Sequence, residues 1–212
     1  MPYGRIIEAC ILLFVIPLCL AVLPTKVPLR VPLLPILLLG ASYALWRCRR
    51  QVDFKEAFNR PRQGWWRAAL ARAGVVAVLS LGFCIMFLPE LLFDFPRHKT
   101  AIWVLVLCLY PFLSVLPQEI IYRLYFFEVV APGKQGKWLK IGLGTLLFSW
   151  VHIIYDNSFA LWGTLIGGAI FNLLYWSYRD EPGVMWRVIL EHSLYGLIIF
   201  TVGLGGFFFL AR

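Results

Sequence analysis

Six of the ionisable side chains inside apolar stretches in the second half of the chain are candidates for chemistry. In sequence order they are Glu119, Arg123, His152, Asp156, Glu191 and His192. An ionisable group at the centre of a membrane helix costs roughly 2.5–3.5 kcal/mol on insertion scales, so such residues are functional candidates by default. A carboxylate and two imidazoles are the groups that a buried site needs to activate a water molecule and stabilise an oxyanion.

Helical spacing groups these residues further. Glu119 and Arg123 are four residues apart, so on a helix they share one face and can form an ion pair. Gln118 and Tyr122 form a second pair at the same spacing, about 100° around the helix from the first. A Glu–Arg pair could merely lock two helices together, and a buried histidine could simply bond a backbone carbonyl. Because three separate apolar stretches each contribute a Glu or a His, we favour a functional site over this structural interpretation.

The same side chains could also hold a metal ion. Glu119, His152 and His192 form a possible zinc set of two histidines and one glutamate. The H-E-x-x-H spacing of many zinc peptidases is absent from the sequence. Zinc is therefore an alternative to a metal-free site.

The composition places these residues in a membrane. Of the 212 residues, 61% are hydrophobic and only 15% are charged. Such a composition is typical of a polytopic membrane protein. We predict an all-α fold of about seven transmembrane helices, with the site in the last four. The apolar stretches cover about 6–23, 31–47, 68–88, 101–130, 140–156, 159–178 and 187–210.

Basic residues lie mainly in alternate loops between these stretches. If the N-terminus is cytoplasmic, thirteen lysines and arginines lie on the cytoplasmic side and five on the other. The thirteen are Arg5 and the basic residues of 47–67, 131–140 and 178–187. The positive-inside rule expects this asymmetry, so we predict a cytoplasmic N-terminus. Loops that face anionic lipid explain the net charge of +9, and we predict no nucleic-acid partner.

Three short motifs, each on its own apolar stretch, resemble those of a known family. They are Gln118-Glu119-xxx-Arg123, Phe148-xxx-His152 and His192 on the last stretch. In this order they resemble the motifs EExxxR, FxxxH and HxxxN or HxxxD of the CPBP intramembrane proteases, a family that includes the type II CAAX prenyl endopeptidases and bacteriocin-processing proteins. The resemblance covers roughly residues 100–210. It implies one membrane domain, 1–212, with accessory helices in 1–100 and a catalytic core in 101–210.

The resemblance implies that a peptide bond is hydrolysed inside the membrane. In the family, the first glutamate of EExxxR and the FxxxH histidine are thought to activate water, while the last histidine and its Asn stabilise the oxyanion. By position, His152 becomes the water-activating histidine, His192 the oxyanion donor, and Glu119 and Arg123 a bracing pair. Family members are described both as metalloproteases and as glutamic proteases. We favour the glutamic type and predict no cofactor, because a single carboxylate is placed near the histidines.

The chain departs from the family's pattern at two positions. Gln118 replaces the first glutamate, and a neutral amide cannot act as a general base. Gly196 replaces the Asn or Asp of the last motif, which removes one oxyanion donor. Either Glu119 takes over as the base after a modest helix rotation, with Glu191 a weaker replacement, or the protein has lost peptidase activity.

The resemblance therefore predicts an intramembrane endopeptidase in a bacterial cell membrane. Its predicted partners are the lipid bilayer and a membrane-anchored protein or peptide substrate. Two other functions stay open. One is a catalytically silent scaffold or bacteriocin-immunity protein with the same fold. The other is a small transporter or proton relay that uses Glu119, His152 and His192, although the sequence shows none of the internal repeats common in transporters.

Overall fold

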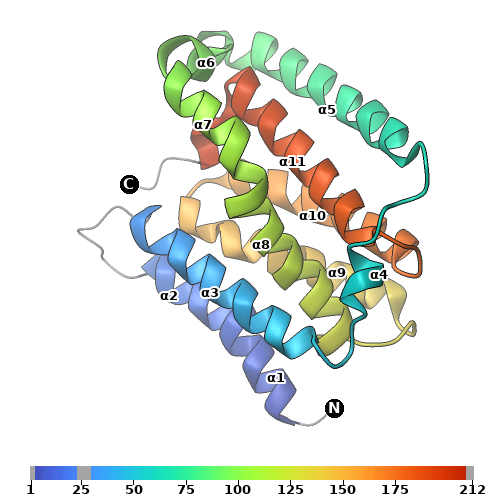
Figure 1. The fold of residues 1–212 in the computed structure, drawn as a ribbon. Helices are drawn as coiled ribbons and strands as arrows, with labels where there is room; N and C mark the ends of the chain where they lie inside the picture. Colours follow the sequence, from blue (N-terminus) through green and yellow to red (C-terminus); the bar gives the residue numbers. More distant parts are fainter. Residues whose placement is uncertain (1–2, 23–29, 209–212) are drawn as a thin grey trace.

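The computed structural model describes residues 3–22 and 30–208. Helices make up 85% of the structure, and no strand occurs within the described ranges, which confirms the predicted all-α fold. Figure 1 shows the α-helices, which are α1 Tyr3–Cys10, α2 Ile16–Val22, α3 Arg30–Cys48, α4 Phe54–Ala57, α5 Trp65–Phe87, α6 Asp94–His98, α7 Thr100–Tyr110, α8 Leu116–Glu119, α9 Lys137–Trp150, α10 Ser158–Tyr178 and α11 Val184–Val202. Several are continued by π-helical segments (Ile11–Val15, Pro111–Val115, Ile120–Val130) or 3₁₀ segments (Pro89–Leu91, Val151–Tyr155, Leu204–Phe208).

Seven apolar helices correspond to the seven predicted membrane spans. In the described part of the chain, six are long and apolar enough to cross a membrane, and Leu33–Cys48 is a shorter one. The six are Gly4–Val22, Trp65–Phe87, Thr100–Val130, Lys137–Tyr155, Ser158–Tyr178 and Val184–Val202. The protein is therefore an integral membrane protein.

One predicted boundary is wrong. The last span was expected to cover 187–210, but α11 ends at Val202, and positions 209 and 210 lie outside the described residues. The helix stops because Gly203 adopts a φ of 122°, where a Cβ atom would collide with the carbonyl oxygen of Leu91. A glycine in this conformation ends a helix where another chain segment approaches closely.

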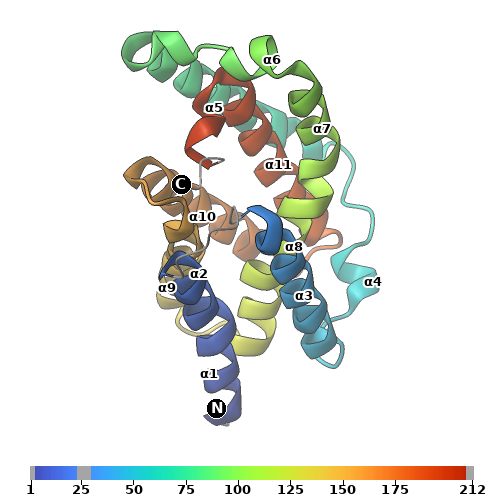
Figure 2. The same ribbon diagram turned by 90° about the vertical axis from the view of Figure 1, so that its left-hand side faces the viewer.

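The helix Thr100–Val130, here called the central helix, crosses the middle of the molecule (Figures 1 and 2). It consists of α7, the π-helical segment Pro111–Val115, α8 and the π-helical segment Ile120–Val130. α3 packs against its second half and α11 against its first half, while α5 packs on α11 and α9 pairs with α10. Almost every residue of Ile120–Val130 is buried, so the centre of the core lies just after Glu119.

Large apolar side chains cover the outside of the helices. On α5, for example, Val75, Val78, Leu79, Ile85 and Met86 are all exposed. Soluble monomers rarely expose contiguous apolar patches larger than a few hundred Å². Lipid chains are the environment that suits such a surface.

Three basic loops lie together at one end of the molecule. The Trp186 indole donates to the carbonyl of Phe58 at 2.8 Å, which joins the segment 47–67 to the start of α11. Arg179 donates to the carbonyl of Gly133 at 3.3 Å, which joins the loop 178–187 to the loop 131–140. These are the loops whose shared side was predicted from the alternation of spans.

Candidate active site

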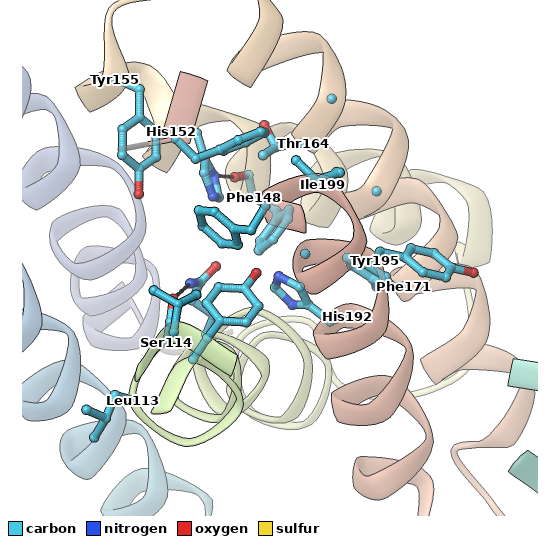
Figure 3. Close-up of a pocket in the computed structure, with 18 of the residues that line it drawn as sticks. Leu113, Ser114, Phe148, His152, Tyr155, Thr164, Phe171, His192, Tyr195 and Ile199 are labelled. Carbon is cyan, nitrogen blue, oxygen red and sulfur yellow. Dashed lines mark hydrogen bonds between the residues drawn. The ribbon is translucent and has the colours of Figure 1, made fainter. Parts of the chain in front are cut away.

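A cavity of about 520 Å³ lies between the central helix, α10, α11 and the 3₁₀ continuation of α9. Its walls are mainly apolar, with a few polar side chains that converge on the interior (Figure 3). Of the predicted site residues, Gln118, His152 and His192 line this cavity. Glu119 and Arg123 do not line it and are fully buried in the adjoining core. A mainly apolar pocket with a few convergent polar groups is the usual form of a ligand site.

Glu119 connects the central helix to His192 on α11. Nδ1 of His192 donates to Oε1 of Glu119 at 2.6 Å, and both side chains are buried. Because the carboxylate is an acceptor, Nδ1 carries the proton and Nε2 of the neutral ring keeps its lone pair. The sequence did not predict this contact, since it joins two helices that lie far apart in the chain.

Arg123 lies behind Glu119 and forms the predicted ion pair. Its Nε lies 3.2 Å from Oε2 of Glu119, although the two groups are not aligned as a hydrogen bond. The guanidinium also stacks over Phe148, 4.2 Å from the ring centroid, and lies 5.4 Å from the centroid of Phe171. Aromatic faces attract a cation most strongly when both are desolvated. One carboxylate and two rings therefore compensate this buried charge.

His152 is oriented by the backbone. Its Nδ1 donates to the carbonyl of Phe148 at 2.7 Å, so Nδ1 again carries the proton and Nε2 is free. The Phe148 ring contacts both histidines edge-on, with centroid distances of 5.0 Å to His152 and 5.6 Å to His192 (Figure 3). Both cavity histidines are thus prepared as proton acceptors at Nε2.

Gln118, and not Glu119, is the residue of the motif that faces the cavity. Its Nε2 donates to Oγ of Ser114 at 2.9 Å, while its Oε1 is buried without a partner in the described part of the chain. Successive residues on a helix point about 100° apart, so Glu119 is directed elsewhere. No Asp or Glu of the described residues lines the cavity.

Gly196 lies one turn after His192 and also lines the cavity. A Cβ atom here would collide with the hydroxyl of Tyr110 and would lie 2.5 and 2.6 Å from Cε1 and Cζ of that ring. Tyr110 of α7 therefore fills the space that a side chain at position 196 would need. No sequence pattern indicates a role for Tyr110, because the contact depends on how α7 meets α11.

The part of the chain that forms this cavity matches a known family. Residues 99–198 match the family described as "Rce1-like: Type II CAAX prenyl endopeptidase Rce1-like". Over this region the chain is similar to the Rce1-like family. The predicted resemblance is confirmed, and the family indicates a CAAX protease-type endopeptidase of the membrane. No curated protein and no solved structure matches the chain.

The remaining candidates from the sequence lie outside the cavity. Glu191 accepts hydrogen bonds from Arg72 and from the hydroxyl of Tyr195, the latter at 2.7 Å. Arg72 of α5 forms an ion pair with this buried carboxylate. Asp156 is exposed at the end of the 3₁₀ segment after His152. Neither carboxylate lines the cavity.

The zinc set that the sequence offered as an alternative consists of Glu119, His152 and His192. Zinc in proteins takes ligand atoms about 2.0–2.3 Å away, with three protein ligands in most catalytic sites. Oε1 of Glu119 accepts from Nδ1 of His192, and Glu119 does not line the cavity. Each histidine donates through Nδ1 and keeps Nε2 open, as metal-bound histidines also do. Among the described residues, no three His, Cys, Asp or Glu side chains gather closely enough to hold a metal ion.

Proposed function

We propose that this protein is an intramembrane endopeptidase that hydrolyses a peptide bond of a membrane-associated protein with an activated water molecule. The observation that supports it most is His192, whose ring lines a cavity inside the membrane while Glu119 holds its Nδ1. The Rce1-like match over 99–198 supports the same reaction class. We propose 101–210 as the catalytic core and 1–100 as accessory helices, although Leu34 and Val76 contribute to the cavity wall.

His192 acts as the general base in this proposal. Its Nε2 takes a proton from water while the water oxygen bonds to the scissile carbonyl carbon. Glu119 stabilises the imidazolium that forms, as the carboxylate does in a Ser-His-Asp triad. The imidazolium then returns the proton to the leaving nitrogen as the C–N bond breaks. Glu119 therefore works through His192 and does not itself contact the substrate.

Gln118 and His152 position the water. The free Oε1 of Gln118 can accept one water hydrogen, in the way that a glutamine orients the attacking water in GTPases. Nε2 of His152 can accept another, because its Nδ1 is committed to Phe148. Gln118 thus has a role that needs no negative charge. The reaction proceeds without a metal in this proposal.

The test is cleavage of an anchored fluorogenic peptide by the purified protein in liposomes. The first probe is a CAAX-type peptide with a farnesylated cysteine, and a panel of apolar helical peptides forms the second. We expect His192→Ala to lower kcat by about 10²–10⁴-fold, the range for general acid–base catalysis. His152→Ala should also lower kcat, because it removes a group that positions the water. His98→Ala is the matched control, because His98 is exposed on α6 and bonds Asp94. Wild-type rates in both cavity variants would refute the proposal.

A silent scaffold is the second candidate, and one observation favours it. No carboxylate of the described residues lines the cavity, since Gln118 stands where the family has a glutamate. A scaffold would bind the anchored peptide without cleaving it. Peptide binding that survives His192→Ala, with no cleavage by the wild type, would support this candidate.

We also propose that the N-terminus is cytoplasmic, in a bacterial inner membrane. Three basic loops lie at one end of the structure, and such loops are retained on the cytoplasmic side. In a variant without the five native cysteines, Lys134→Cys and Lys99→Cys can be labelled with a maleimide that does not cross membranes. We expect intact cells to label position 99 and not 134, and the reverse result would invert the orientation.

A further inference from the structure

Tyr110 is the last residue of α7 and lines the same cavity as His152 and His192. Pro111 follows it and starts the π-helical segment Pro111–Val115. Such segments are common at functional sites, since they change the direction in which side chains leave a helix. The Tyr110 ring packs edge-on against Phe200 at 5.3 Å and against His192 at 6.3 Å between centroids.

The hydroxyl of Tyr110 is held against the backbone of α11. Any side chain at Gly196 would collide with this hydroxyl and with the two nearest ring carbons. The glycine therefore makes room for the hydroxyl one helical turn from His192. Tyr110 and His192 both belong to the cavity wall, and the centroids of their rings lie 6.3 Å apart.

This hydroxyl is available to a ligand. The structure records no hydrogen bond from the Tyr110 hydroxyl to another of the described residues. The cavity around this hydroxyl is mainly apolar. A phenol donates one hydrogen bond, and buried hydroxyls are nearly always paired. A group that enters the cavity can supply the missing acceptor.

Neither cavity histidine can donate to the oxyanion of the proposed reaction. With Nδ1 of both histidines committed, Nε2 of each neutral ring is an acceptor and cannot donate to a carbonyl oxygen. One N–H of Gln118 is also committed, to Ser114. Negative charge develops on the carbonyl oxygen in the transition state, and a fixed donor in a dry site stabilises it strongly.

We propose that the Tyr110 hydroxyl is a catalytic residue, the oxyanion donor of this site, and that Gly196 exists to admit it. This inference rests on the proposed endopeptidase function. As water bonds to the carbonyl carbon, the C=O π bond becomes a C–O⁻ group, and the water proton passes to Nε2 of His192. Tyr110 donates a hydrogen bond to that oxygen and keeps its own proton throughout. When the C–N bond breaks, the carbonyl re-forms and the imidazolium proton moves to the leaving nitrogen.

The test is Tyr110→Phe in the anchored-peptide assay. We expect kcat to fall by about 10²–10³-fold, the effect of removing one oxyanion donor, with KM within about threefold of the wild-type value. Phenylalanine keeps the ring contacts with Phe200 and His192, so the thermal unfolding temperature should be unchanged. Tyr125→Phe is the matched control, because the Tyr125 hydroxyl has no partner among the described residues and lies outside the cavity.

A double-variant cycle separates the hydroxyl from packing. Gly196→Ala should displace Tyr110 and lower kcat, whereas Gly142→Ala, where a Cβ has open space, should not. In Tyr110→Phe/Gly196→Ala the two losses should not multiply, because both variants remove the same donor. Fully multiplicative losses would show that Gly196 acts independently and would overturn the link between the two residues.

The outcomes for Tyr110 and for the protease function can be told apart. If the wild type cleaves and Tyr110→Phe keeps kcat within about twofold, the oxyanion role is wrong and the protease stands. A rise in KM alone, or an equal loss in Tyr125→Phe, also overturns the role. If the wild type cleaves neither the CAAX-type peptide nor any peptide of the apolar panel, both proposals fail.

Discussion

Replacing Glu119 by glutamine tests whether this carboxylate acts through His192 or only braces the fold. Glutamine keeps the size of the side chain but loses its charge, and its amide can donate as well as accept. It therefore no longer forces the proton onto Nδ1 of His192, and it has no negative charge to stabilise an imidazolium. We expect kcat to fall by about 10²–10⁴-fold, the contribution of a general base.

The same change removes the counter-ion of Arg123, so stability must be measured separately. Both side chains of this pair are 0% exposed, and neither Nη atom of Arg123 has a hydrogen-bond partner among the described residues. Removal of one partner of a buried pair costs about 3–5 kcal/mol. The rings of Phe148 and Phe171 still cover the guanidinium, which places the expected loss at the lower end, about 3 kcal/mol.

A double variant separates the two effects. Breaking a buried ion pair is costly because it leaves one charge uncompensated, and neutralising both partners removes that cost. Glu119→Gln/Arg123→Met should therefore recover most of the lost stability while kcat stays low. Glu128→Gln is the control on the same helix, because Glu128 also pairs with an arginine, Arg179, but lies outside the cavity. It should lose stability and keep kcat.

The assay combines thermal unfolding in detergent with cleavage of the anchored peptide in liposomes. Both are measured on the same preparations, so a loss of folded protein is not counted as a loss of rate. A double variant that regains wild-type kcat together with its stability would refute the role of Glu119 and leave it as a structural brace.

Three further outcomes follow from the same geometry. Gln118→Glu should raise kcat about tenfold or more in the liposome assay, because it replaces the unpaired amide oxygen in the cavity with a basic carboxylate. An unchanged kcat would show that residue 118 does not face the attacking water. Incubation with a zinc chelator should leave the cleavage rate unchanged, since no metal-binding cluster occurs among the described residues. Inactivation by the chelator that added zinc reverses would contradict the metal-free proposal. Gly203→Ala should lower the unfolding temperature, with a loss of about 1–3 kcal/mol of folding free energy. Alanine at a φ of 122° is strained, and its Cβ would meet the Leu91 carbonyl. An unchanged unfolding temperature would show that the end of α11 adapts.

The membrane spans and one ion pair were predictable because both depend on local sequence. Long apolar stretches mark spans whatever their neighbours are, and Glu119 and Arg123 meet through their spacing on one helix. The convergence of His152 and His192 on one cavity agrees with the order of the motifs. The individual roles of these residues stay predictions until variants are measured.

The contacts of the site that join distant helices were not predictable. Arg72 and Glu191 are each ordinary in sequence and become a pair only when α5 packs on α11. Tyr110 resembles many other tyrosines in an aromatic-rich chain until Gly196 is seen to make room for it. The π-helical segments of the central helix also have no sequence signal, since their hydrogen bonds depend on the surrounding packing.

Rotation of the central helix was one way for Glu119 to replace the missing cavity carboxylate, and the packing argues against it. Glu119 and Arg123 share a face, so a turn of about 100° would move both residues together. Arg123 would leave the Phe148 ring, 4.2 Å away, and Glu119 would leave His192. A buried charge deprived of its partner costs several kcal/mol, which no contact in the mainly apolar cavity would offset. The carboxylate can therefore influence the cavity at low cost in one way, through the imidazole that it already holds.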